Sequence, residues 1–202
     1  MSGSAAPWGY ALSDYKQPSV TADAVILRPG PELLLIRRGG EPFKGDWALP
    51  GGFLQDDETV ETCAAREAFE ETGVRLPALL PCGVFSAPGR DPRGWVVSHA
   101  FTCMAQVDSV RAGDDAAAAA WFSVETVPAG ADLTLRLQNG GTCLTARLTA
   151  EARHFGRTDY RVAERGGLAF DHAAVIACAL EALEREFPGI LRTGEIPEAF
   201  RY

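Results

Sequence analysis

Three glutamates that share one face of a predicted helix constrain the possible structure and function of this chain more than any other feature. Glu67, Glu70 and Glu71 are separated by three and four residues, and at about 100° per residue they fall within roughly a 100° arc. The helix is predicted over about 59–72, with Gly73 at the position of a left-handed C-terminal cap. Like charges at these spacings destabilise a bare helix. We therefore expect a compensating cation, and oxygen-only ligands favour Mg²⁺ or Mn²⁺.

Residues before the three glutamates extend the pattern. Arg66 directly precedes Glu67, and Glu58, eight residues before Arg66, is expected to be its ion-pair partner. For an arbitrary acidic segment, a solvated helix surface is the simpler interpretation. The longer pattern fixes seven residues, and its chance occurrence in one chain is roughly one in a million or rarer. These residues are Gly52-x5-Glu58-x7-Arg66-Glu67-x2-Glu70-Glu71-x-Gly73.

Composition and charge exclude several classes of protein. The chain has 19 Lys and Arg and 27 Asp and Glu, which gives a formal net charge of −8. Binding a long nucleic acid requires a basic face, and no run of basic residues supplies one. Hydrophobic residues make up 47% and charged residues 23%, as in globular domains. The five scattered cysteines indicate reduced thiols. With no signal peptide or membrane span recognised, we expect a cytoplasmic protein that binds neither membranes nor nucleic acid.

Apolar runs separated by turn residues predict a mostly β chain. Runs at 20–27 and 32–38 flank a Pro/Gly turn and are expected to form a hairpin. A second hairpin is predicted over 133–148, where apolar and polar residues alternate around an Asn-Gly-Gly turn. The last helix is expected over about 173–186, with Asp171 as its N-cap. Shorter strands are predicted at 83–86, 95–107 and 121–123.

These elements predict one domain with additions. The domain is expected over 19–187. An N-terminal arm over 1–18 and a C-terminal tail over 188–202 flank it.

The string from Gly52 to Val74 resembles the Nudix box, with Ala68 where a larger aliphatic residue is usual. The resemblance extends upstream over 42–51 and covers about 18–187. Relative to a minimal domain of this family, it implies an inserted β-hairpin at about 131–160, whose function the sequence does not indicate. It implies an α/β Nudix fold, in which a mixed β-sheet is sandwiched between helices, and it implies a homodimer. It also implies a hydrolase that cleaves the diphosphate of a small-molecule nucleotide, using Mg²⁺ or Mn²⁺.

The resemblance also implies roles for individual residues. Glu67, Glu70 and Glu71 would be metal ligands, together with the carbonyl of Gly52, while Glu58 and Arg66 would orient the helix and its carboxylates. The general base lies in this family either in the box or on a loop outside it. Candidates here are Asp114, Asp115 and a glutamate of the box, and the two aspartates also fit an ordinary solvated loop.

Two further strings look like the ADP-ribose pyrophosphatase branch and its relatives in NAD metabolism. They are Gly89-Arg90-Asp91-Pro92-Arg93-Gly94 and Leu168-Ala169-Phe170-Asp171-His172. The implied reaction converts ADP-ribose and water to AMP and ribose 5-phosphate. Arg90 and Arg93 suit a diphosphate or a terminal ribose phosphate, or else a β-turn with surface arginines. For His172, local capping at the helix start is favoured over a ligand role.

Basic residues flank the expected cleft as well. Arg37, Arg38 and Lys44 are neighbours of Trp47, and of these Arg38 and Lys44 are candidates for substrate binding. Trp47 itself, close to Pro50, is expected in the core rather than stacked on a base.

Two other functions stay open at this point. One is a Nudix hydrolase of another nucleotide, such as NADH, a nucleotide sugar or a dinucleoside polyphosphate. The other is a non-catalytic ADP-ribose sensor, or a regulator that carries a winged helix-turn-helix domain. Only 30 of the 202 residues follow His172, which is too few for that domain, and every glutamate of the box is present.

Overall fold

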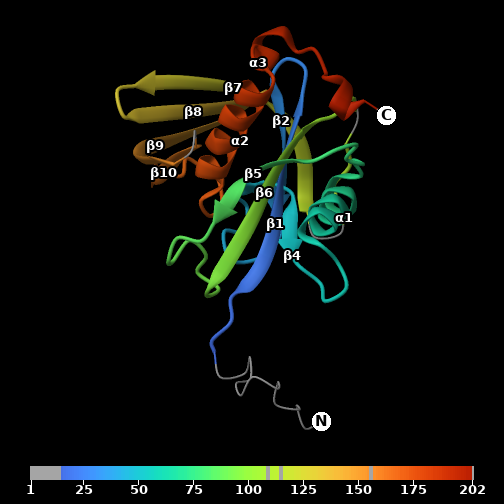
Figure 1. The fold of residues 1–202 in the computed structure, drawn as a ribbon, viewed down its shortest axis with the longest axis vertical. Coiled ribbons are helices and arrows are strands. Elements are labelled where there is room, and N and C mark those ends of the chain that lie inside the picture. Colours follow the sequence, from blue (N-terminus) through green and yellow to red (C-terminus); the bar gives the residue numbers. More distant parts are fainter. Residues whose placement is uncertain (1–14, 108–109, 114–115, 155–156, 202) are drawn as a thin grey trace.

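A mixed β-sheet forms most of the protein. The computed structural model describes residues 15–107, 110–113, 116–154 and 157–201, and in these it contains ten strands (Figure 1). The strand order is β10-β9-β8-β7-β2-β1-β6-β5, with β3 paired to β2 and β4 to β1. β1 and β6 pair in parallel, and the remaining pairs are antiparallel. The strands are β1 (Ser19–Arg28), β2 (Glu32–Arg38), β3 (Trp47–Ala48), β4 (Gly51–Phe53), β5 (Leu80–Phe85), β6 (Val96–Met104), β7 (Ala116–Ala129), β8 (Asp132–Asn139), β9 (Thr142–His154) and β10 (Arg157–Glu164).

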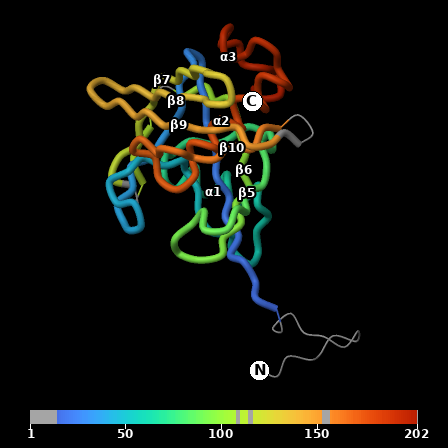
Figure 2. The backbone as a smooth tube through the Cα atoms, turned by 90° about the vertical axis from the view of Figure 1, so that its left-hand side faces the viewer, coloured from blue at the N-terminus to red at the C-terminus, as the bar shows by residue number. Residues whose placement is uncertain are grey.

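Two helices cover the two faces of the central strands. α1 (Val60–Thr72) lies against β1 and β4, and α2 (His172–Glu186) lies on the other side of the sheet (Figure 1). α2 contacts β9 and β10 near one end of the strand order and β5 and β6 at the other. The sheet therefore curls around α2, and β7 to β10 pass across it when seen from that side (Figure 2).

Burial on both faces explains the composition of the central elements. β1 is buried continuously from Thr21 to Leu27, as expected for a strand covered by helices on both sides. α2 buries nearly every side chain from His172 to Leu183, which is the pattern of a helix that is apolar all round. One large core cluster joins these residues to Leu33–Leu35 of β2 and Phe122 of β7.

The structure confirms the main elements that the sequence predicts. β1 and β2 form the first hairpin, β8 and β9 form the second, and both helices begin within one residue of the expected positions. The strand predicted at 121–123 is much longer, because the alanines from 116 onward pair with β2. The second hairpin also gains a third strand, because β10 pairs with β9.

The chain beyond Pro188 packs onto the core. α3 (Ile190–Thr193) and the short 3-10 helix η2 (Glu198–Phe200) follow α2, and Ile190, Ile196 and Phe200 are buried in the main cluster. The rings of Phe187 and Phe200 lie 5.6 Å apart. No described helix has the length and apolar character needed to cross a bilayer.

Candidate active site

The caps and the buried face of α1 orient its acidic face. The Thr59 side chain accepts a hydrogen bond from the Thr62 N–H at 3.3 Å, and Gly73 ends the helix with a left-handed backbone. The buried face consists of small side chains, which let the helix approach the sheet closely. They are Cys63, Ala64, Ala68 and Thr72.

Arg66 connects three of the glutamates. Its guanidinium donates to both oxygens of Glu58, at 2.6 and 2.9 Å, and to Glu67 at 2.8 Å and Glu70 at 3.0 Å. These bonds supply the positive charge that the like-charged face requires. They also hold the pKa of Glu58 well below its usual range, at about 2, because Arg66 stabilises the carboxylate. The ion pair expected between Glu58 and Arg66 is therefore confirmed.

Replacing Arg66 with methionine is expected to destabilise the protein in a pH-dependent way. The folded-state pKa of Glu58 lies below its ordinary value of 4.5, so its contribution to stability is present above that value and is lost as pH falls to about 2. We expect the variant to have the lower melting temperature at pH 7, and the difference to shrink at pH 3. Thermal denaturation at both pH values measures this. Replacing the exposed Arg192 with methionine serves as control, and an equal difference at both pH values would contradict the assignment.

Glu71 and Glu67 lie against the Gly51–Gly52 backbone of β4. The Gly51 N–H donates to Glu71 at 3.0 Å. A Cβ atom on Gly52 would stand 2.2 Å from Oε1 of Glu67, so this close approach requires glycine. Burial raises the pKa of Glu71 to about 8, and it also raises the pKa of Glu67 despite the hydrogen bond from Arg66. Burial therefore disfavours the charged form of both carboxylates in the protein alone, and the bond from Arg66 offsets only part of this cost for Glu67.

This arrangement fits a divalent cation, which would offset the burial of the two carboxylates. Glu70 is more exposed and turned to Arg66, with 57% of its side chain accessible. Within the described residues, no three Asp, Glu, His or Cys side chains gather closely enough to form a complete cage. Water and phosphate oxygens would have to complete the coordination of an ion at Glu67 and Glu71, which is a common mode of Mg²⁺ binding. The Gly52 carbonyl is a further oxygen nearby and accepts a weak bond from the Cys63 thiol at 3.7 Å.

A wide cleft of about 780 Å³ opens over these carboxylates. Arg38 and Arg93 also line it, together with Phe53. The Arg93 guanidinium lies 4.7 Å from the Phe53 ring centroid and 5.1 Å from that of Phe170, and Arg38 lies 5.0 Å from Phe170. The cleft thus combines acidic side chains on α1 with two guanidinium groups held against aromatic rings.

The other residues expected at the substrate site lie in different surroundings in the structure. The side chain of Arg90 is only 4% exposed and donates twice to Asp171, at 2.9 and 2.6 Å, so its charge is already paired. Lys44 is exposed and is not among the residues that line the cleft. Trp47 packs edge-on against Phe122 at 4.8 Å, so its expected place in the core is confirmed.

Of two expectations for the start of α2, the N-cap position of Asp171 is confirmed, and local capping by His172 is wrong. Asp171 stands at the N-cap position, but its side chain makes no capping hydrogen bond because it pairs with Arg90. His172 does not act locally either. Its Nδ1 accepts the N–H of Leu49 at 2.9 Å, a residue 123 positions earlier in the chain.

The candidate bases Asp114 and Asp115 lie outside the described residues. The loop that precedes them contacts the end of α1, where the Gly113 N–H donates to the Glu71 carbonyl at 2.9 Å. Glu67, Glu70 and Glu71 line a hollow together with Arg111 to Gly113. The general base therefore stays a prediction.

Sequence reasoning missed Asp23, which lies in the middle of buried β1. It is 6% exposed, and burial raises its pKa. The only signal was one carboxylate in the otherwise apolar run Val-Thr-Ala-Asp-Ala-Val-Ile-Leu. Asp91 was also missed as a separate residue, and it fixes Arg93 through bonds of 2.7 to 3.2 Å.

Comparison with known proteins agrees with this site. The family model of the NUDIX domain matches residues 17–140, more than half of the chain. An ADP-ribose pyrophosphatase from Methanocaldococcus jannaschii is 44% identical over 116 residues, which are 56% of this chain and 67% of that protein. A MutT/nudix family protein from Enterococcus faecalis has a TM-score of 0.73 and 32% identity, covering 92% of this chain and 70% of its own.

A further solved structure is a bifunctional NMN adenylyltransferase/ADP ribose pyrophosphatase from Francisella tularensis, complexed with AMP and a Mn ion. It is 35% identical, with a TM-score of 0.50, and the match covers 54% of this chain and 35% of that chain. The family model, the curled mixed sheet with its flanking helices and the acidic helix α1 agree with one another. The chain belongs to the Nudix family.

Proposed function

We propose that this chain is a Mg²⁺-dependent pyrophosphohydrolase that converts ADP-ribose and water to AMP and ribose 5-phosphate. The cleft carries the proposal, because it brings Glu67 and Glu71 together with Arg38 and Arg93 in one open space. A diphosphate needs positive charge on its oxygens, and a cation at the carboxylates and two guanidinium groups would supply it. The similarity to the pyrophosphatase from M. jannaschii supports ADP-ribose as the substrate.

The side chains of the cleft have separate tasks in this proposal. Glu67 and Glu71 would hold the cation, with Glu70 as a further ligand if it leaves Arg66. Arg93, fixed by Asp91, and Arg38, whose Nε donates to the Pro42 carbonyl at 2.8 Å, would bind the substrate's phosphates. Both guanidinium groups keep donors for this purpose, because an arginine has five N–H bonds.

The reaction is the attack of water on one phosphorus atom of the diphosphate. A P–O bond forms to the water oxygen, and the bond from that phosphorus to the bridging oxygen breaks. When bound, Mg²⁺ would neutralise the diphosphate and stabilise the charge on the leaving phosphate. The proton of the water passes to a general base, for which we retain Asp115 and a glutamate of α1 as candidates.

Mg²⁺ is proposed from the all-oxygen donors of the site, and the Mn ion in the F. tularensis structure supports a divalent metal in this family. The homodimer that the resemblance implies stays a prediction.

Product analysis tests the proposal. The purified protein is incubated with Mg²⁺ and ADP-ribose, NADH, nucleotide sugars or dinucleoside polyphosphates, and the products are separated by chromatography. We expect AMP and ribose 5-phosphate from ADP-ribose, with kcat/KM at least tenfold above that for the other compounds, and no product once the metal is chelated.

Other results would identify the alternatives. Preferential cleavage of another compound would keep the reaction class and overturn the substrate. Tight binding of ADP-ribose without turnover of any compound would favour a sensor over an enzyme.

A further inference from the structure

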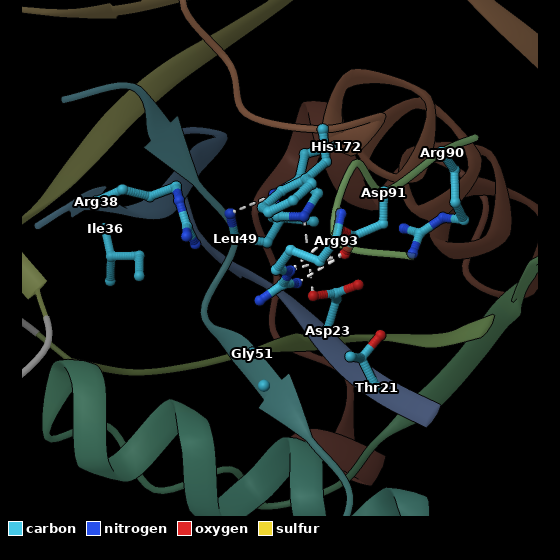
Figure 3. Close-up of a pocket in the computed structure, with 12 residues that line it drawn as sticks. Thr21, Asp23, Ile36, Arg38, Leu49, Gly51, Arg90, Asp91, Arg93 and His172 are labelled. Atoms are coloured by element: carbon cyan, nitrogen blue, oxygen red, sulfur yellow. Dashed lines mark hydrogen bonds and ion pairs between the residues drawn. The ribbon is translucent and has the colours of Figure 1, made fainter. Parts of the chain in front are cut away.

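A small polar pocket adjoins the wide cleft, and two of its residues, Asp23 and His172, have no role in the reaction as proposed above. It has a volume of about 50 Å³, and it shares Arg38, Gly51, Gly52 and Arg93 with the cleft. Figure 3 shows Asp23 and His172 at this pocket, close to Arg93 and to the strand that carries Gly51. A buried water needs about 10–15 Å³ of such space, so the pocket admits a few hydroxyl groups or waters and excludes a nucleobase.

Two of the three guanidinium groups that line this pocket are already paired, and the third, that of Arg38, is shared with the cleft. Arg90 is bound at both ends of its fork by Asp171, and Arg93 by Asp91. Asp91 and Arg90 are almost fully buried, so these pairs are fixed parts of the wall. The pocket therefore suits a neutral polar group better than another phosphate.

His172 presents a hydrogen-bond donor to the pocket. Its Nδ1 accepts the Leu49 N–H, so a neutral ring carries its proton on Nε2. Burial lowers the pKa of His172 to about 4, which keeps the ring neutral at pH 7. Nε2 lies 3.9 Å from Oδ1 of Asp23, which is too far for a direct hydrogen bond.

Asp23 presents the matching acceptor. Its other oxygen, Oδ2, accepts a short hydrogen bond from the Ser98 hydroxyl. Among the residues that the structure describes, neither Oδ1 of Asp23 nor Nε2 of His172 has a hydrogen-bond partner of its own. Both side chains are more than nine-tenths buried, with 9% of Asp23 and 6% of His172 accessible. Both atoms remain accessible from the pocket, so a polar group that enters it can bind them.

One oxygen atom can satisfy both groups. An oxygen about 2.9 Å from Nε2 and from Oδ1 fits the 3.9 Å gap, because that gap is less than twice a hydrogen-bond length. A hydroxyl group accepts from Nε2–H and donates to Oδ1 at the same time. A phosphate oxygen without a proton cannot donate.

We infer that Asp23 and His172 bind a hydroxyl of the substrate's distal sugar, meaning the sugar that carries no base. The inference rests on the proposed function. The nucleoside needs the wide cleft, which Phe53 lines, since its base does not fit into about 50 Å³. The distal sugar lies on the other side of the diphosphate, so its hydroxyls are the groups of the substrate that can enter the small pocket. Asp23 and His172 are then specificity-determining residues that select a hydroxylated sugar.

Substrate analogues test this inference without any variant. The analogues are ADP-ribose that lacks the C2 or the C3 hydroxyl of the distal sugar, and ADP-ribose that lacks the 2′-hydroxyl of adenosine. Loss of one buried partner should lower kcat/KM by about 10- to 100-fold for at least one distal-deoxy analogue. The adenosine-side analogue should change kcat/KM less than threefold. Discrimination on the adenosine side alone, or none, would overturn the inference while ADP-ribose is still cleaved.

A variant then assigns the effect to Asp23. In Asp23→Asn the amide oxygen would keep the bond from the Ser98 hydroxyl, so the amide NH2 group would face the pocket and could not accept from a hydroxyl. This variant should lower kcat/KM for ADP-ribose about 10- to 100-fold and leave the sensitive distal-deoxy analogue nearly unchanged, because the lost bond is absent there. A merely structural role would lower both rates equally and would contradict the assignment. Asp57→Asn, at an exposed loop residue, is the matched control. Absence of any ADP-ribose turnover in the wild type would overturn the proposed function and this inference with it.

Discussion

Glu71→Gln is expected to lower kcat at least about 100-fold while making the metal-free protein more stable at alkaline pH. Removing a residue that only supports a metal ligand typically costs 10- to 100-fold, so loss of the ligand itself should cost no less. The glutamine keeps the shape of the side chain, and its amide oxygen can still accept the Gly51 N–H. The fold should therefore be retained.

The gain in stability follows from the burial of Glu71. Its pKa is about 8 in the folded metal-free protein, against an ordinary value of 4.5. The folded state therefore prefers the protonated form, so the contribution of Glu71 is fully present below about pH 4.5 and is lost as pH rises through 8. At pH 9 the wild type carries a buried charge that the variant lacks. We expect the variant to melt at least about 2 °C higher, the shift that 1 kcal/mol produces in a domain of this size.

Thermal denaturation in chelator at pH 5 and pH 9, together with steady-state kinetics in Mg²⁺, measures both effects. Glu61→Gln on the same helix is the control, since Glu61 is exposed in the first turn. In Mg²⁺ the order of stability at pH 9 should reverse, because the wild type gains the binding energy of the ion. Full activity of Glu71→Gln would remove Glu71 from the metal site. If Glu71→Gln melts at a lower temperature than the wild type at pH 9 in chelator, the buried charge of Glu71 does not destabilise the folded protein.

Local patterns predicted the parts of this fold that depend on local chemistry. α1 has a threonine cap, a closing Gly73 and apolar residues at helical spacing. The β8–β9 hairpin has strict alternation around a glycine turn. Each of these elements is determined by residues close together in the sequence, and each lies where the sequence predicts it.

Elements that depend on distant partners were not predictable in the same way. The alanines at the start of β7 have a helical preference, but they form a strand because β2 offers a buried edge with which they pair. Asp171 has the position and chemistry of an N-cap, but Arg90, 81 residues earlier, takes its carboxylate. In both cases a tertiary partner outweighs a local preference.

The candidate site also has a part that local sequence predicts and a part that depends on distant residues. The glutamates of α1 and Arg66 are close together in sequence, so their spacing alone indicates a metal site. Apart from Arg38 of β2, the charged and polar side chains of the small pocket come from β1, the loop after β5 and the start of α2, which no spacing connects. Its buried polar pairs form only because the curled sheet brings these three segments together.

Gly52→Ala is expected to reduce activity about as much as loss of a metal ligand, at little cost in stability. The added Cβ would lie 2.2 to 2.7 Å from the three carboxyl atoms of Glu67. This carboxyl is the far end of a flexible side chain, so it can swing away and relieve the clash. Glu67 would then leave the site proposed for the cation. We expect kcat/KM to fall at least about 10- to 100-fold while the urea midpoint stays within error of the wild type.

Gly51→Ala is the informative comparison, because the neighbouring glycine touches backbone. Its Cβ would lie 2.4 Å from the carbonyl oxygen of Ala22 and 2.9 Å from Cα of Asp23, and neither atom can rotate away. Strands β1 and β4 would have to separate, which should cost about 1–3 kcal/mol in urea denaturation. Gly141→Ala is the control, since its Cβ meets nothing within 4 Å.

A double-mutant cycle decides whether displacement of Glu67 explains the effect of Gly52→Ala. If it does, Gly52→Ala should have almost no further effect on kcat/KM in a Glu67→Ala background, because the atoms that the methyl group displaces are gone. Additive losses would mean that Gly52 acts through its own carbonyl or through substrate contact. Gly51→Ala is the control for this cycle. Its loss of stability should be the same in the Glu67→Ala background, because its added Cβ clashes with β1 rather than with α1.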